Sequence, residues 1–148
     1  MKKTIGLAVI LLAINSTTFA QVKENESKEN IKVPAVVTSA LHKKYAEAKN
    51  VTWEKEDGNY EANWGGKSGE DNSVQFTPSG TFIEIVNAIA VNQLPANVTN
   101  YIKQHYNGAK ITEAGKVTDA AGKLSYEAEV HGKDITFDEN GNFIKAEK

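Results

Sequence analysis

The chain of 148 residues contains no cysteine, and none of its 17 basic residues is an arginine. Without cysteine, no disulfide can form and no lipid can be attached to a cysteine that follows a leader sequence. Without arginine, and with a formal net charge of −2, the chain is poorly suited to gripping phosphate backbones. We therefore expect no nucleic-acid partner.

Patterns typical of metal binding and catalysis are also missing. His42, His105 and His131 show no His-x-x-x-His spacing, so no transition-metal site is expected. No serine lies in the Gly-x-Ser-x-Gly segment of many hydrolases. We predict no catalytic residues, no cofactor and no enzyme activity.

Residues 138–142 (Asp-Glu-Asn-Gly-Asn) are similar to the start of a calcium loop. An EF-hand needs more ligands and a bidentate glutamate at its twelfth position, which this segment lacks. A hairpin turn whose glycine takes a positive φ is the favoured interpretation, and calcium binding is the alternative.

The N-terminus has the three-part sequence pattern of a secretory signal peptide. Lys2 and Lys3 precede an apolar run over 5–14, and small residues follow up to Ala20. This pattern predicts a signal peptide over 1–20 that is cleaved between Ala20 and Gln21. The apolar run is shorter than the roughly 20 residues that span a bilayer, so no stable membrane anchor is expected after cleavage. The mature protein, with 15 lysines against 19 acidic residues, is predicted to be periplasmic or secreted.

After the signal peptide, residues 21–32 are almost entirely polar and predict a flexible tether. The rest of the chain, 33–148, is expected to form one domain from two repeats, 33–87 and 94–148. Identical residues recur with an offset of 61, and the segment 74–83 matches 135–144 without gaps. The identical pairs are Pro34 and Pro95, Tyr45 and Tyr106, Ala48 and Ala109, and Lys49 and Lys110.

Each repeat reads as one helix followed by four strands. The helices are expected to begin near Pro34 and Pro95, since proline suits the first helical position. The period then changes from about 3.6 to 2, which is typical of strands. The expected strands are 51–55, 60–64, 73–76 and 81–86 in the first repeat, and 111–118, 124–130, 135–137 and 142–146 in the second. Short connections favour antiparallel hairpins.

Alternation along the strands assigns two faces to the sheet. The first face is apolar and is expected to form the core under the helices, with Tyr60, Ala62, Trp64, Val74, Phe76, Tyr126, Ala128, Val130, Ile135 and Phe137. The opposite face carries Glu61, Asn63, Glu127 and Glu129, and we expect it to be open to water or to a partner. Trp53 is a further candidate contact residue, and the long segment 65–72 is where the two repeats differ most.

Several of these motifs are shared with a known family. The first copy has Val-Pro at 33–34, Tyr-x-x-Ala-Lys at 45–49, Tyr-Glu-Ala at 60–62 and Gly-x-Phe at 80–82. The second copy repeats the last three motifs in the same order, and Leu94-Pro95 stands at its helix start. The chain thus resembles the PepSY-like, beta-lactamase-inhibitor-like exported proteins of Bacteroidetes. The resemblance implies an α+β fold with helices on one face of an antiparallel sheet, and it implies no catalytic residues. The family's name reflects its likeness to an inhibitor that grips an enzyme with a concave sheet face; beta-lactamase inhibition does not follow from that.

The sequence predicts a non-enzymatic exported binding or inhibitor-like module. The ligand is expected to be a protein or peptide, held on the open sheet face by Glu61, Asn63, Glu127 and Glu129, with Trp53 as a further contact. The alternative is an envelope sensor that binds a cation or a small molecule through the same carboxylates or the Asp138 turn.

Overall fold

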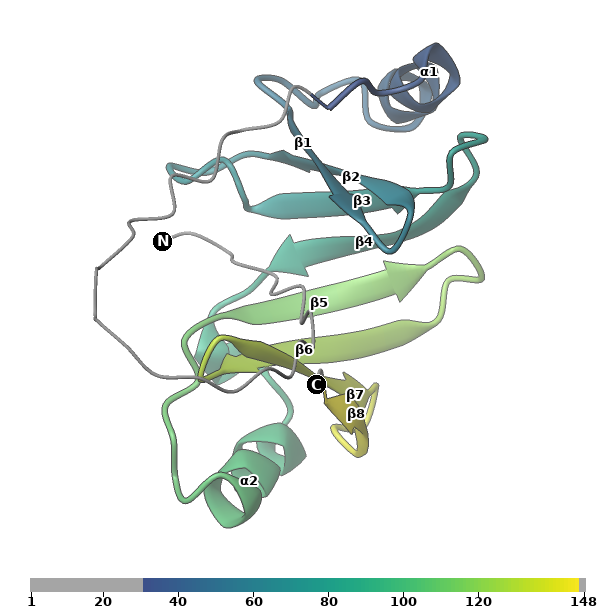
Figure 1. The fold of residues 1–148 in the computed structure, drawn as a ribbon. Coiled ribbons are helices and arrows are strands. Elements are labelled where there is room, and N and C mark those ends of the chain that lie inside the picture. Colours follow the sequence, from purple (N-terminus) through teal and green to yellow (C-terminus); the bar gives the residue numbers. More distant parts are fainter. Residues whose placement is uncertain (1–30, 147–148) are drawn as a thin grey trace, which may run out of the picture.

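The computed structural model describes residues 31–146 as two α-helices and one eight-stranded antiparallel sheet (Figure 1). The predicted signal peptide and nearly all of the predicted tether lie outside the described residues. The first half contains α1 (Ala35–Lys44), β1 (Thr52–Glu56), β2 (Asn59–Trp64), β3 (Asn72–Phe76) and β4 (Phe82–Ala88). The second half contains η1, a short 3₁₀ helix (Val91–Gln93), then α2 (Ala96–His105), β5 (Ala114–Asp119), β6 (Leu124–Val130), β7 (Lys133–Asp138) and β8 (Phe143–Ala146).

The strands lie in the sheet in the same order as in the chain, from β1 to β8. The two halves join where β4 pairs with β5, from Glu84 opposite Asp119 to Ala88 opposite Gly115. Their strands therefore form one continuous sheet, although α2 lies between β4 and β5 in the sequence. The predicted α+β class with two α-β-β-β-β units is confirmed. The sequence patterns had not indicated that the two halves share one continuous sheet.

Both helices begin directly after a proline. The carbonyl oxygens of Pro34 and Pro95 accept hydrogen bonds from Val37 N–H and Val98 N–H, both at 2.9 Å. Each proline is the N-cap, so it lies one residue before the first helical position, at which the sequence analysis had placed it. Proline has a fixed φ and no N–H of its own, so it suits a helix start.

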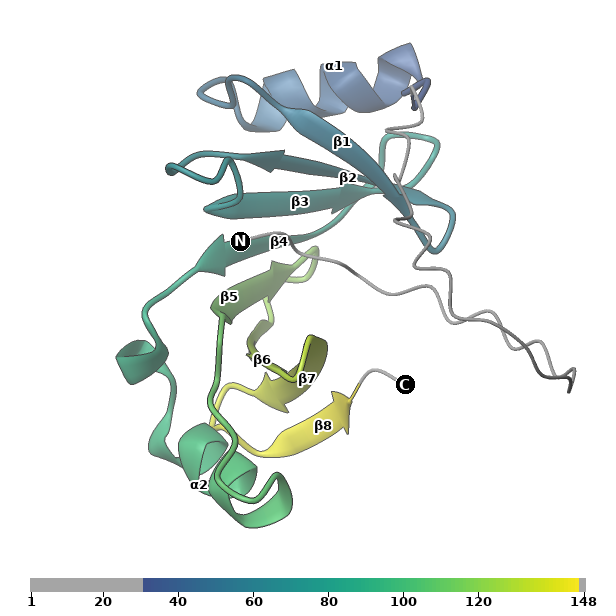
Figure 2. The same cartoon turned by 60° about the vertical axis from the view of Figure 1, so that its left-hand side comes forward.

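Each helix packs on its own half of the sheet. Val37 and Leu41 of α1 contact the apolar face of β2 and β3, and Val98 and Ile102 of α2 contact that of β6 and β7. Figure 2 shows the result, a strongly curved sheet whose outer side carries α1 at one end and α2 at the other. The predicted apolar face is confirmed as the core, with Tyr126 packed at its edge.

The hairpins after β3 and β7 both contact a helix N-terminus. Their glycines, Gly80 and Gly141, have φ of +81° and +80°. A Cβ added at Gly80 would lie 2.9 Å from the carbonyl oxygen of Val36, and one at Gly141 would lie 3.0 Å from the Cβ atoms of Pro95 and Asn97. The repeated glycine therefore satisfies two requirements, a left-handed turn and a close approach to the helix.

Candidate functional site

The sheet face away from the helices carries a row of acidic residues. Consecutive cross-strand pairs run from Glu54 to Glu61, Gln75, Glu84 and Asp119, one residue from each of β1 to β5. Like charges directly opposite each other, as Glu54 and Glu61 are, destabilise an antiparallel pair. We call these five residues, four acidic and one glutamine, the acidic row. Asp119 also has a role in the fold, because its Oδ1 accepts the N–H groups of Ala121 and Lys123 in the turn after β5.

Curvature brings the two halves of this face together around a cleft. In a flat sheet, β4 and β8 would lie about 19 Å apart, at about 4.8 Å per strand. Instead Glu84 of β4 and Lys145 of β8 line the same cavity, which has a volume of about 170 Å³. A second cavity of about 240 Å³ shares Val86, Glu127 and Asp134 with the first. The two cavities together form what we call the acidic cleft.

Acidic side chains dominate the lining of the acidic cleft, and among residues 31–146 Lys145 is the only basic residue that lines it. The second cavity also includes Ser68, Glu70 and Asp71 from the long connection between β2 and β3, which the sequence had marked as the largest difference between the repeats. The acidic lining residues are Glu56, Asp57, Glu61, Glu70, Asp71, Glu84, Glu113, Glu127, Glu129 and Asp134.

Glu61 and Asn63 lie on the cleft face of β2, but they are not open to solvent. Their side chains are only 8% and 6% exposed, so the prediction of an open position was wrong for these two residues. Ser73 Oγ donates a hydrogen bond to Glu61 Oε1 from the neighbouring strand. Asn63 Oδ1 is buried and has no hydrogen-bond partner. The alternation of residues along β2 identified the face of the sheet correctly, but it gave no sign of the sheet curvature that encloses Glu61 and Asn63.

Glu127 and Glu129 lie on the same face in β6, and both are half-buried. Thr112 Oγ1 donates to the carboxylate of Glu129 and, at 3.2 Å, to its backbone carbonyl. Trp53 lies on the other face, because it pairs with Ala62 and packs against the core of the first half. The structure therefore brings four of the five predicted contact residues to one face and leaves Trp53 apart from them.

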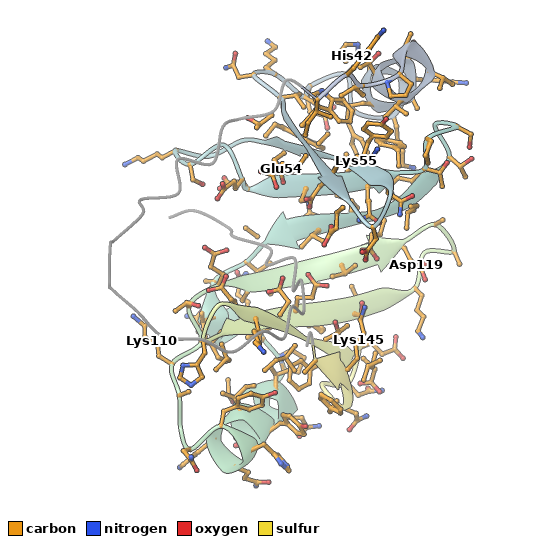
Figure 3. All side chains as sticks on the ribbon, viewed as in Figure 1. His42, Glu54, Lys55, Lys110, Asp119 and Lys145 are labelled. Atoms are coloured by element: carbon orange, nitrogen blue, oxygen red, sulfur yellow. The ribbon has the colours of Figure 1, made fainter. Side chains whose placement is uncertain are left out.

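Glu84 and Asp119 were not singled out in the sequence, although both belong to the acidic row and Glu84 lines the first cavity. In the same cavity, Gln75 Nε2 donates a hydrogen bond to Glu56 Oε2 at 3.0 Å. Figure 3 labels Asp119 on β5 and Lys145 on β8. Glu84 and Lys145 are 61 residues apart and so occupy equivalent positions in the two repeats. Only the folded sheet shows that both line the same cavity.

Glu84 has a perturbed acidity. Burial raises the pKa of Glu84 above its ordinary value, nearby Lys145 lowers it, and Asp119 and Glu61 raise it. Because the folded protein then holds this proton more tightly than the unfolded chain does, the group favours folding at low pH. This contribution is lost as the pH rises through the folded-state pKa.

Replacing Glu84 with glutamine is expected to remove this pH dependence. The wild type should lose stability relative to Glu84→Gln as the pH rises from below the ordinary glutamate pKa of about 4.3 toward neutrality. Urea unfolding of both proteins at several pH values measures the difference. A difference that stays constant across this range would contradict the assignment.

The histidines and the Asp138 turn lie apart from the acidic cleft. His42 is exposed on α1 (Figure 3), and His105 stacks on Tyr101 with ring centroids 4.2 Å apart. Asp138 Oδ1 accepts N–H groups of Asn140 and Asn142, and these bonds together with the Asn142 side chain lower the pKa of Asp138. Gly141 has positive φ there, which confirms the hairpin interpretation.

Within residues 31–146, no group of three or more histidine, aspartate or glutamate side chains is placed to hold a metal ion. In the same part of the chain, no helix has the length and apolar character needed to cross a membrane.

A family model described as "Putative beta-lactamase-inhibitor-like, PepSY-like" matches the chain twice, over residues 21–83 and over residues 66–145. This protein belongs to the PepSY-like family. The resemblance found in the sequence motifs is thereby confirmed. Among curated proteins, no sequence relative matches this PepSY-like chain.

Solved structures share the PepSY-like fold seen here. A protein from Bacteroides eggerthii, described among "putative periplasmic proteins", is 20% identical, and the match covers 78% of this chain and 88% of that chain with a TM-score of 0.64. A BLIP-like protein from Bacteroides fragilis is also 20% identical, with 80% and 88% covered and a TM-score of 0.55. Similarity at this level of identity establishes the fold.

Proposed function

We propose that this PepSY-like protein is a non-enzymatic exported binding module that holds a protein or peptide in the acidic cleft. The observation that carries the proposal is the first cavity, which residues from both halves line, including Glu61 of β2, Glu127 of β6 and Lys145 of β8. Like-charged neighbours such as Glu54 and Glu61 cost stability, which supports a role in binding.

A bulky substitution tests the proposal without changing any charge. Val86 lines both cavities and is half-buried, so Val86→Phe is expected to obstruct the cleft. Val36, which is 51% exposed on α1, offers the same substitution outside the cleft as Val36→Phe. Protein partners captured from the native cell envelope by the wild type and by Val36→Phe should be lost with Val86→Phe.

The captured partner is then purified, and its affinity for the three proteins is measured directly. Both variants must keep the circular-dichroism spectrum of the wild type. Equal affinity for Val86→Phe and Val36→Phe would show that the partner binds elsewhere and would overturn the proposal.

Export is part of the same proposal. Export is supported by the B. eggerthii protein, which is described among "putative periplasmic proteins", and by the predicted signal peptide of this chain. The mature protein, recovered from cells that express the full chain, is expected to begin at Gln21 in N-terminal sequencing. Recovery of the protein with Met1 as its first residue would contradict the predicted cleavage.

A further inference from the structure

The acidic cleft has features that define the chemistry of its ligand. Lys145 enters it from β8, the last strand, and lines the first cavity with Glu61 and Glu84. Its position follows from the register, in which Lys145 pairs with Thr136, the cross-strand neighbour of Glu127. An ammonium group on a flexible chain therefore already fits among these carboxylates.

A second feature is the unpaired oxygen of Asn63. This side chain is 6% exposed, lies on the cleft side of β2 and is the cross-strand neighbour of Ser73, which lines the first cavity. A buried acceptor without a donor costs free energy. Lysine and arginine side chains carry several N–H donors and no acceptor, so their hydrogen-bonding groups complement this oxygen and the carboxylates that line the cavity.

We propose that the acidic cleft binds a cationic peptide segment, with a lysine or arginine side chain entering beside Glu61 and Glu84 and competing there with Lys145. Charge complementarity selects this ligand, because the acidic row and the cleft lining repel an acidic segment and offer a neutral one no ionic contact. The inference rests on the proposed function and specifies the ligand of the same site.

Direct binding of synthetic peptides tests the charge requirement. The probes are fluorescein-labelled peptides of alternating lysine and serine, of alternating glutamate and serine, and of serine alone. The lysine peptide is expected to bind at least about tenfold more tightly than the other two, and more weakly as salt screens charges beyond about 8 Å at 0.15 M ionic strength. Equal binding of the three peptides, or no binding of the lysine peptide at low salt, would overturn the inference.

Substitutions in both directions locate the bound cation. Glu61→Gln/Glu84→Gln is expected to weaken lysine-peptide binding about tenfold or more, because charge-assisted hydrogen bonds are lost. Lys145→Gln removes the internal competitor and is expected to tighten binding about two- to fivefold. Glu47→Gln/Glu139→Gln makes the same charge change at exposed positions outside the cleft and should have little effect.

The tighter binding expected for Lys145→Gln cannot arise from misfolding. It therefore tests the inference even if Glu61→Gln/Glu84→Gln is destabilised. Weakening by the control pair as large as by the cleft pair, or unchanged binding in Lys145→Gln, would overturn the inference. A native partner that Val86→Phe excludes, but that binds Glu61→Gln/Glu84→Gln as well as the wild type, would overturn the cationic ligand and leave the proposed function standing. Indifference of that partner to Val86→Phe would overturn both.

Discussion

Replacing Phe137 with alanine is expected to lower the free energy of unfolding by about 3–5 kcal/mol. The side chain of Phe137 is fully buried in the core of the second half, where it packs edge-on against Tyr101 of α2 with ring centroids 5.5 Å apart. Truncation removes this burial and leaves a cavity that the surrounding strands fill only in part. Urea unfolding followed by tryptophan fluorescence and circular dichroism measures the loss.

Phe143 provides the matched control, because the same substitution there removes a ring that is 43% exposed. It stacks on Tyr101 at 4.9 Å, so Phe143→Ala is expected to cost about 0.5–1.5 kcal/mol. Equal losses for the two variants would contradict the assignment of Phe137 to the core.

Gly141→Ala is expected to destabilise the protein by about 2–5 kcal/mol. Positive φ costs a residue with a Cβ about 1–2 kcal/mol, and forcing a methyl group into a packed site costs about 1–3 kcal/mol. Both apply at Gly141, which has φ of +80° and close contacts with Pro95 and Asn97. The measurement is again the free energy of unfolding in urea.

Gly122 separates the two contributions. Its φ is also +80°, but an added Cβ would have no atom within 4 Å, so Gly122→Ala is expected to cost only about 1–2 kcal/mol. If both variants lost the same free energy, the packing of the last hairpin against α2 would accommodate the added methyl group without strain, contrary to the expectation.

Local patterns predicted the local structure well. The prolines located both helix starts, the turn glycines located the hairpins, and alternation assigned Trp64 and Phe137 to the core. These features depend on residues that are close in the sequence, or on a periodicity that one strand contains by itself. The repeat strengthened them because each pattern occurred twice.

The acidic cleft could not be predicted in the same way. Its geometry depends on the pairing of β4 with β5 across α2, and on the curvature of the whole sheet, neither of which leaves a periodic signal. Glu84 and Asp119 therefore passed unnoticed, although they are neighbours in the acidic row. Alternation also placed Glu61 on a polar face without revealing that the opposite half of the sheet approaches it. Trp53 could have been assigned to the core by extending the alternation of β2 across the first hairpin.

The strand pairs of the sheet differ in the entropic cost of closing the chain segment between them. Every other strand pair joins segments that are consecutive in the chain, whereas Ala88 must meet Gly115 across the whole of η1 and α2. The entropic cost of bringing two segments together rises with the length of chain between them, so the β4–β5 pair has the highest closure cost of the sheet. Residues of both halves line the cleft, so it comes into existence only when the two halves have folded together.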